Sequence, residues 1–233
     1  MPAVARAGPR YDGHMHVTDL PDRSQDYLKA IWDITERTGT PVALGELARV
    51  TEQKLPTASE AVKRLARQEL VHHEPYSGVT LTDDGRRLAL AMVRRHRLLE
   101  TFLVTVLGYT WDEVHDDADL LEHGVSDRLL ARIDAHLDHP TRDPHGDPIP
   151  AADGSVESLS GDSLAAVSPG SEVVVEQIND HDPGLLRYLA DHGIVPGVSV
   201  RIDAPVTAGL LTVLVDGRPV PVSETSLGDI RVR

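Results

Sequence analysis

The fold of the N-terminal part is decided by residues 53–67, which read QKLPTASEAVKRLAR. The first of these residues predict a turn, and Pro56 falls in the first turn of the following helix, where its missing N–H costs no hydrogen bond. Just upstream, residues 44–50 carry apolar side chains at helical spacing and predict a shorter helix. Two helices joined by such a turn predict a helix-turn-helix, a motif that reads the major groove of DNA.

The flanking segments complete a winged helix. Apolar residues recur at helical spacing from about Asp22, and Gly39 is expected to end that helix. Residues 70–82 alternate apolar and polar side chains around a Tyr-Ser-Gly turn, which predicts a hairpin that would form the wing. The first residues of the chain lack periodicity, and we expect residues 1–20 to form a flexible leader.

Charge is distributed unevenly along the chain. The net charge is −14, yet residues 54–97 hold nine Lys or Arg against five Asp or Glu, whereas residues 98–233 hold eight against twenty-four. The basic charge is therefore concentrated in one segment, which begins in the helix-turn-helix and suits a polyanionic partner. The acidic remainder would repel DNA and offers oxygen ligands for metals.

The chain contains no cysteine. This absence excludes disulfides, thiolate nucleophiles and sulfur-bound zinc, so any metal must be held by oxygen and nitrogen. No apolar run approaches the roughly 20 residues that cross a bilayer, and the N-terminus lacks the apolar core of a signal peptide. We therefore expect a cytoplasmic protein with no membrane partner.

Three further helices are expected at residues 82–107, 111–123 and 126–137. In the second of them, two carboxylates and two imidazoles share one stripe, because residues three and four apart lie on the same helix face. The preceding helix offers another imidazole and carboxylate four residues apart. The stripe consists of His115, Asp119, Glu122 and His123, and the pair consists of His96 and Glu100. Two such helices packed together predict a divalent metal site.

The ligand types narrow the choice of metal. Asp119, Glu122 and His123 supply three ligands, and Asp26 on the first helix is a candidate for a fourth. Carboxylate and imidazole without sulfur suit Mn(II) or Fe(II) better than copper. A solvated helix face is the alternative for the triplet alone, but the second pair on another helix favours a metal site.

The C-terminal part has a different composition. Residues 138–168 are rich in Pro, Gly, Asp and Ser, which indicates a linker or an irregular arm. Four short β-rich runs follow, bounded by turn residues, and they predict a small β-barrel. These runs are residues 172–178, 198–202, 211–215 and 219–222. Together with the helical first half they predict an α+β protein.

Several segments together resemble the diphtheria toxin repressor family, and within it the manganese-sensing branch of manganese transport regulators. The resemblance runs from about Leu20 to the end of the chain. Its strongest pieces are DYL (26–28), LPTAS (55–59), RHRLLE (95–100), VHDDADLLEH (114–123) and DPIP (147–150).

This resemblance implies a homodimeric, metal-activated transcriptional repressor that is not an enzyme. It would bind palindromic operators of manganese-uptake genes and take no small-molecule substrate other than the metal ion. The implied domains are a winged helix (21–90), a helical metal-binding and dimerisation domain (91–140), a linker (141–168) and an SH3-like, FeoA-type domain (169–233).

The resemblance also implies two metal sites. The primary site would consist of Asp26, Asp119, Glu122 and His123, and the ancillary site of His96, Glu100, His115 and Asp180. Iron-sensing members have methionine where Asp26 stands and cysteine where Asp119 stands, so the hard oxygens here favour Mn(II), with Fe(II) or Co(II) as substitutes. Lys29 stands where shorter manganese regulators have a glutamate, which argues against a binuclear cluster.

One ancillary ligand of the iron-sensing type has no counterpart. Its glutamine falls near Pro183 in this chain, and His181 or Asp182 could stand in for it.

The recognition helix carries the residues expected to touch DNA. Thr57 and Ser59 are short enough for close approach, and Pro56 suits a thymine methyl. Glu60 either accepts a hydrogen bond from cytosine N4 or is simply solvated. The remaining residues suit phosphates, which position the protein without specifying sequence, and they are Lys54, Lys63, Arg64 and Arg67.

Three functions compete with a manganese repressor. An Fe(II)-responsive repressor of the same family would use the same fold. A di-metal helical-bundle enzyme usually draws Glu-x-x-His from two helices, whereas Glu122 and His123 are adjacent. A winged-helix regulator that senses something other than metal would use the acidic and imidazole residues for structure only.

Overall fold

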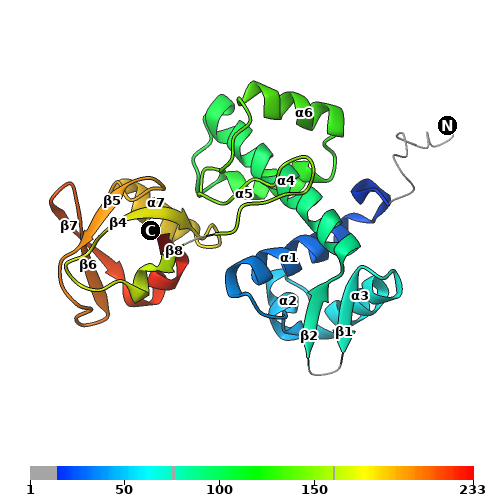
Figure 1. Ribbon diagram of the computed structural model, residues 1–233, viewed down its shortest axis with the longest axis horizontal. Coiled ribbons are helices and arrows are strands. Elements are labelled where there is room, and N and C mark those ends of the chain that lie inside the picture. The colour runs from blue at the N-terminus through cyan, green and yellow to red at the C-terminus, as the bar shows by residue number, and fades with distance from the viewer. Residues whose placement is uncertain (1–14, 75–76, 160) are drawn as a thin grey trace. The chain divides into compact units, whose positions relative to one another are not determined.

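The computed structural model describes residues 15–74, 77–159 and 161–233. The chain divides into two compact units, residues 1–93 and 94–233, and the boundary falls within helix α4 (Asp83–Leu107). The first unit is mostly helical, and the second combines helices with a sheet (Figure 1). The predicted α+β class is confirmed.

The first unit is a winged helix. Before α4, its elements are η1 (Val17–Asp19), α1 (Asp22–Thr38), α2 (Leu44–Val50), α3 (Leu55–Arg67), β1 (Val71–Glu74) and β2 (Gly78–Leu81). The predicted helices and hairpin are therefore present. The turn around Tyr76 and residues 1–14 of the predicted leader lie outside the described residues. The end of that leader was wrongly predicted as flexible, because Val17 and Leu20 are buried in the apolar core of this unit.

Apolar packing holds this unit together. Leu28 and Ile31 of α1, Leu47 of α2 and Leu65 of α3 are fully buried in one cluster that also takes in the start of α4. At the end of α1, Gly39 adopts a left-handed φ of 66° and donates its N–H to the carbonyl of Thr35. These contacts fix which face of α3 remains exposed.

The second unit begins with a helical part. It holds the rest of α4, α5 (Val114–Glu122) and α6 (Asp127–His136), whose N-terminus is capped by Ser126. We expected α5 to begin at Trp111, but residues 111–113 form a turn. Glu113 accepts a hydrogen bond from the N–H of Thr110 there, and Trp111 packs against the core of the β part instead of continuing a helix.

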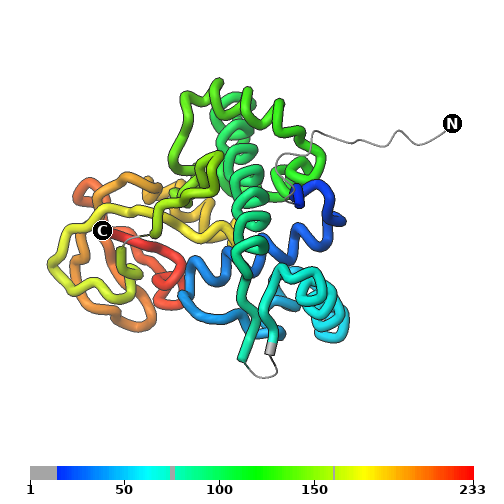
Figure 2. The backbone as a smooth tube through the Cα atoms, turned by 45° about the vertical axis from the view of Figure 1, so that its right-hand side comes forward, coloured from blue at the N-terminus to red at the C-terminus, as the bar shows by residue number. Residues whose placement is uncertain are grey.

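The β part contains an antiparallel sheet with the strand order β3-β8-β4-β5-β6-β7, and the C-terminal end of the chain lies within it (Figure 2). The strands are β3 (Asp162–Ser163), β4 (Glu172–Ile178), β5 (Ser199–Ile202), β6 (Leu210–Val215), β7 (Arg218–Ser223) and β8 (Ile230–Val232). The remaining elements are η2 (Leu164–Ala166), α7 (Pro183–Asp191) and η3 (Glu224–Asp229). The four predicted strands are present, whereas β3, α7 and β8 were not predicted.

Strand β7 forms one edge of this sheet. A two-residue turn of Asp216 and Gly217, both at positive φ, joins it to β6. Two of its residues, Pro219 and Pro221, have no N–H, and the hydroxyl of Tyr188 donates to the carbonyl of Pro221.

Part of the predicted linker is an ordered strap, which we define as residues 141–150. The N–H of Ile178 on β4 donates to the carbonyl of His145 at 2.9 Å, and Arg97 of α4 donates to the carbonyl of Pro148 at 2.7 Å. Gly146 lies so close to β4 that an added Cβ would come within 2.1 Å of the Glu176 carbonyl oxygen. The strap therefore links α4 to the sheet within the second unit.

Among the described residues, no helix combines the length and apolar character that spanning a membrane requires.

Candidate metal centres and DNA-binding surface

His96 lies at the centre of a buried network between α4 and α5. Its Nε2 is 2.9 Å from Oε1 of Glu100, one turn along α4, and its Nδ1 is 2.7 Å from Oε2 of Glu122 on α5. All three side chains are buried. One imidazole thus contacts a carboxylate on each side.

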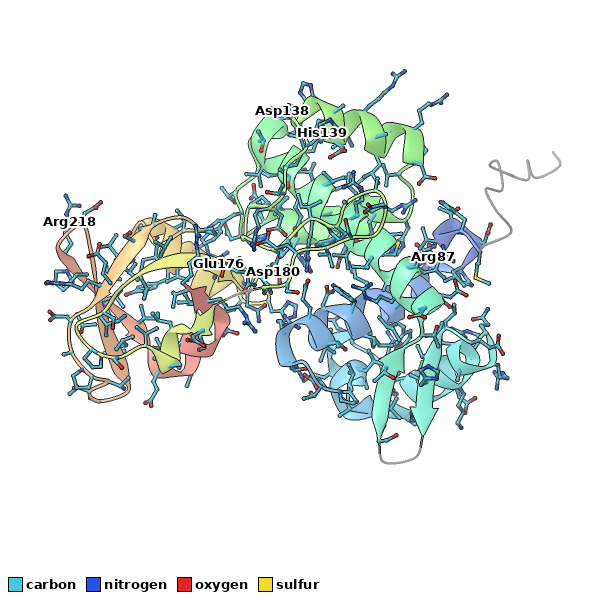
Figure 3. The ribbon with its side chains drawn as sticks, viewed as in Figure 1. Arg87, Asp138, His139, Glu176, Asp180 and Arg218 are labelled. Atoms are coloured by element: carbon cyan, nitrogen blue, oxygen red, sulfur yellow. The ribbon has the colours of Figure 1, made fainter. Side chains whose placement is uncertain are left out.

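The four residues predicted for the ancillary site lie together. His115 Nδ1 is 3.3 Å from Oε1 of Glu100 and 3.1 Å from Oδ2 of Asp180. Asp180 follows β4 (Figure 3). With His96, these residues place one ligand atom each within 4.8 Å of one another. The helical part and the β part both contribute to this cluster.

Strong charge coupling marks the cluster. Burial opposes protonation of His115, but hydrogen bonds to Asp180 and Glu100 outweigh it and raise the pKa of His115 to about 10. Burial also opposes ionisation of Asp180, yet His115 and His181 hold the pKa of that carboxyl well below its usual range. Without metal, an imidazolium therefore supplies the positive charge that a cation could supply.

His181 and Asp182, the two candidate substitutes, have different surroundings. His181 Nδ1 is 3.0 Å from Oδ1 of Asp180, so it adjoins the ancillary cluster. Asp182 instead caps α7 by accepting from the N–H groups of Gly184 and Leu185.

Two further candidate ligands, Asp143 and His145 of the strap, were not foreseen. With Glu100 they form a third cluster within the same 4.8 Å limit, and all three are buried. Within the described part of the chain, neither Oε2 of Glu100 nor Nδ1 of His145 has a hydrogen-bond partner, and these atoms lie 3.7 Å apart. The short His-Gly-Asp run in a Pro-rich segment carried no helical spacing that could have revealed them.

The chemistry of this third cluster fits a divalent cation. Nε2 of His145 lies 2.7 Å from the carbonyl of Trp111, so a neutral ring that donates there presents the lone pair of Nδ1 to Glu100. Burial opposes protonation of His145, but Glu100 outweighs it and raises the pKa of His145 to about 10. Burial also raises the pKa of Asp143 well above its usual range, and Asp147 and Glu100 add to the effect. Buried polar atoms without a hydrogen bond are costly, and a hard metal would satisfy them.

The predicted primary ligands on α5 and at its C-terminal cap are partly connected to the same network. Asp119 Oδ1 is 3.1 Å from Nδ1 of His96, and His123 Nε2 is 3.8 Å from Oε1 of Glu122. His96 therefore contacts members of both predicted sites, whereas the sequence predicts it in the ancillary site alone. Asp26 belongs to the first unit, where it lies 3.7 Å from Arg23, and its participation stays a prediction.

The expected DNA-contacting residues share one face of the first unit. Their side chains are exposed except that of Ser59, which is half-buried, and the exposed ones are Lys54, Pro56, Thr57, Glu60, Lys63, Arg64 and Arg67. The opposite side of α3 is buried through Ala58, Ala61, Val62 and Leu65. This arrangement leaves a polar, largely basic helix face available to a partner.

An apolar groove of about 810 Å³ crosses the helical part of the second unit. Residues of α4, α5 and α6 line it, and several are large and exposed: Val106, Leu107, Leu120, Leu121 and Leu129. An apolar patch of this kind is typical of a protein interface.

Three family models match this chain. They are the iron dependent repressor N-terminal DNA binding domain (residues 19–79), the iron dependent repressor metal binding and dimerisation domain (82–151) and the FeoA domain (163–233). Together they match most of the described residues.

Similar proteins carry the names of both iron and manganese regulators. The iron-dependent repressor IdeR of Mycobacterium leprae is 34% identical over 213 residues, 86% of this chain and 92% of its own. The diphtheria toxin repressor of Corynebacterium glutamicum is 39% identical over 194 residues, 79% of this chain and 85% of its own.

Among solved structures, a manganese-dependent transcriptional repressor in complex with manganese is 50% identical, with a TM-score of 0.85 over 90% of this chain and 98% of the other. The manganese regulator SloR is 32% identical, with a TM-score of 0.76 over 90% of this chain and 97% of the other. The chain belongs to the diphtheria toxin repressor family of metal-dependent transcriptional repressors.

Proposed function

We propose that the protein is a homodimeric repressor that Mn(II) activates to bind palindromic operators of manganese-uptake genes. The observation that carries this proposal is the donor set around the buried Glu100, which offers only carboxylate oxygens and imidazole nitrogens. Such hard and intermediate ligands suit Mn(II). The similar structure named as a manganese-dependent repressor in complex with manganese supports the choice. The protein acts as a regulator and not as an enzyme.

Two sites would hold the metal. We assign the primary site to Asp26, Asp119, Glu122 and His123, and the ancillary site to His96, Glu100, His115 and Asp180. Asp143 and His145 would extend the ancillary site, because Glu100 belongs both to the ancillary cluster and to the cluster with Asp143 and His145. Oxygen ligands at Asp26 and Asp119, where iron-sensing members have sulfur, would disfavour softer metals.

The switch would work through repulsion between carboxylates. Asp119 and Glu122 are two acids on one face of α5, and Asp26 adds a third when α1 approaches them. A bound divalent cation supplies the positive charge that makes this approach favourable. Asp26 would then hold α1, and with it the recognition helix α3, at a fixed distance from its counterpart in the second protomer. Recognition helices that enter successive major grooves lie about 34 to 36 Å apart.

The apolar groove would form the dimer interface. It lies within residues 82–151, which match the metal binding and dimerisation model. A second copy of this chain would cover Leu120, which is 76% exposed, together with its apolar neighbours. A Leu120→Asp variant is expected to lower the mass measured by light scattering from that of a dimer to that of a monomer.

The metal switch is tested by operator binding. DNA fragments retained by the Mn(II)-loaded protein would be footprinted, and their Kd measured again in excess chelator. We expect a palindromic footprint with Mn(II) and its loss with chelator. Equal affinity under both conditions would show that the metal switch is wrong.

Metal selectivity is tested by replacing two oxygen ligands of the proposed primary site with sulfur ligands. The double variant Asp26→Met, Asp119→Cys is expected to shift activation from Mn(II) towards Fe(II). Asp116→Cys is the matched control, because Asp116 is exposed on α5 outside the clusters. A double variant that responds to Mn(II) as the wild type does would contradict the primary-site assignment.

An Fe(II)-responsive repressor is the second candidate, because the similar full-length proteins include iron-dependent repressors. Anaerobic titration with Fe(II) in the same assay separates the two. Tighter operator binding with Fe(II) than with Mn(II) at equal free metal would favour this candidate.

A further inference from the structure

The exposed face of α3 carries one acidic side chain among basic and uncharged ones. Glu60 is the only acid between Leu55 and Arg67. Residues three and four positions apart share a helix face, so Glu60 lies on the exposed stripe between Thr57 and Arg64. The acid therefore occupies the middle of the surface that approaches DNA.

A carboxylate at this place is unfavourable unless it meets a donor. DNA presents about one phosphate charge per 1.7 Å of helix axis, which repels it. A carboxylate oxygen accepts hydrogen bonds and cannot donate them. The presence of Glu60 on this face is therefore explained by a donor group of the partner, by its ion pair with Lys63 within the helix or by plain solvation.

Lys63 keeps Glu60 ionised and orients it. Its Nζ donates to Oε1 of Glu60 at 2.8 Å, and this hydrogen bond lowers the pKa of that carboxyl. The other oxygen, Oε2, has no hydrogen-bond partner among the described residues. The Glu60 side chain is 67% exposed. One carboxylate oxygen is thus held by the helix while the other remains available.

The major groove offers few donors to such an oxygen. Only cytosine N4 and adenine N6 present N–H groups there. In adenine the acceptor N7 lies next to N6 and would repel the second carboxylate oxygen, which is why glutamine and asparagine suit adenine. Cytosine presents its amino group without that neighbouring acceptor, so it fits a carboxylate better.

We propose that Glu60 specifies a cytosine at one position of each operator half-site by accepting a hydrogen bond from its N4 amino group. This inference rests on the proposed function, because it takes α3 as the helix that enters the major groove.

The test compares base preference in three proteins. Wild type, Glu60→Gln and Glu69→Gln would each select from a randomised palindromic duplex pool with Mn(II). Kd would then be measured on single-base variants of the selected sequence. Glu69→Gln is the matched control, because it removes the same charge from an exposed residue just beyond α3.

We expect the wild type and Glu69→Gln to select cytosine at one symmetric position. Its replacement should weaken wild-type binding by about 5- to 150-fold, the range for one wrong base contact. Glu60→Gln should select adenine there. The proposal is overturned if Glu60→Gln keeps the wild-type base profile and binds every sequence more tightly by a similar factor, which is the behaviour of a solvated charge.

A chelator arm keeps this result separate from the metal switch. If chelator leaves DNA binding unchanged, the proposed Mn(II) switch is wrong, but the base profiles of the same three proteins still decide the role of Glu60.

Discussion

The two units of the protein treat charge in opposite ways. In the described part of residues 1–93, the buried polar side chains are Ser24 and Gln25, which are both uncharged. The second unit buries a set of ionisable side chains: Arg95, His96, Arg97, Glu100, Glu122, Asp143 and His145. Apolar packing thus forms the cores of both units, and the metal-binding unit adds a buried set of charged side chains to its apolar cores.

This difference indicates whether each unit needs a ligand for full stability. Burial of apolar side chains is favourable without a ligand. Buried charges remain costly unless their pairing and hydrogen bonding are complete, and Glu100 Oε2 and His145 Nδ1 lack hydrogen-bond partners in the described structure. A cation would therefore stabilise the second unit directly, whereas the first unit would respond to it only through Asp26 of the proposed primary site.

The largest expected effect is a loss of stability in the first unit when its apolar core is disrupted. Leu65→Ala should destabilise the first unit by about 2–5 kcal/mol, because Leu65 is fully buried and its truncation leaves a cavity. The chain has two tryptophans, and Trp32 lies in the first unit while Trp111 lies in the second. Urea unfolding followed by Trp32 fluorescence in a Trp111→Phe background measures the loss.

The reverse background supplies the control. With Trp32→Phe, the fluorescence of Trp111 should report an unchanged midpoint. An equal shift of the unfolding midpoint at both tryptophans would mean that the two units unfold together. The proposed difference between their stabilities would then be wrong.

Metal binding should raise the free energy of unfolding of the second unit. Mn(II) at a hundredfold excess over Kd should stabilise the second unit by about 2.7 kcal/mol, measured by Trp111 fluorescence. Glu100→Gln should remove most of this gain, because Glu100 belongs to two of the clusters. Glu172→Gln, an exposed residue of β4, should retain it. Full stabilisation of Glu100→Gln would contradict the assignment.

Protons should compete with the metal. His115 and His145 have pKa values of about 10 without metal, so both are protonated at neutral pH and must lose a proton to coordinate. Mn(II) affinity should therefore rise with pH between about 6.5 and 8, by about tenfold per pH unit for each proton displaced. Calorimetry in two buffers of different ionisation enthalpy counts the protons released. Identical heats in both buffers, with a Kd independent of pH, would refute this competition.

The smallest expected effect tests whether a part of the second unit contributes to stability independently of the metal sites. Ser126→Ala should cost about 1 kcal/mol, because the Ser126 hydroxyl accepts from the N–H of Leu129 at the start of α6. Mn(II) affinity should stay the same, since Ser126 belongs to none of the clusters. A parallel loss of affinity would show that the metal centres depend on the whole helical part.

Most of the fold could be predicted because its elements are amphipathic. The helices of the first unit repeat apolar residues at helical spacing, and the strands of the second unit are short β-branched runs. Helix α7 was missed although Asp182 and Pro183 form a typical helix start, because its few apolar residues stand among β-rich segments.

The residues of the candidate sites likewise divide into those that helical spacing could reveal and those that it could not. His96, Glu100 and His115 could be found because helix geometry fixes which residues share a face. Asp180 came from family resemblance. Asp143 and His145 could not be found, because a hydrogen bond between the strap and β4 positions them, and no local sequence pattern encodes that pairing.

The edge strand β7 limits how the chain can assemble. In a two-residue hairpin, alternate residues turn their N–H groups away from the partner strand, and in β7 these positions are Pro219 and Pro221. A further strand that approached this edge would find two donors missing and one carbonyl already occupied by Tyr188. Sheet extension, the usual route to fibrous aggregates, is therefore blocked at this edge.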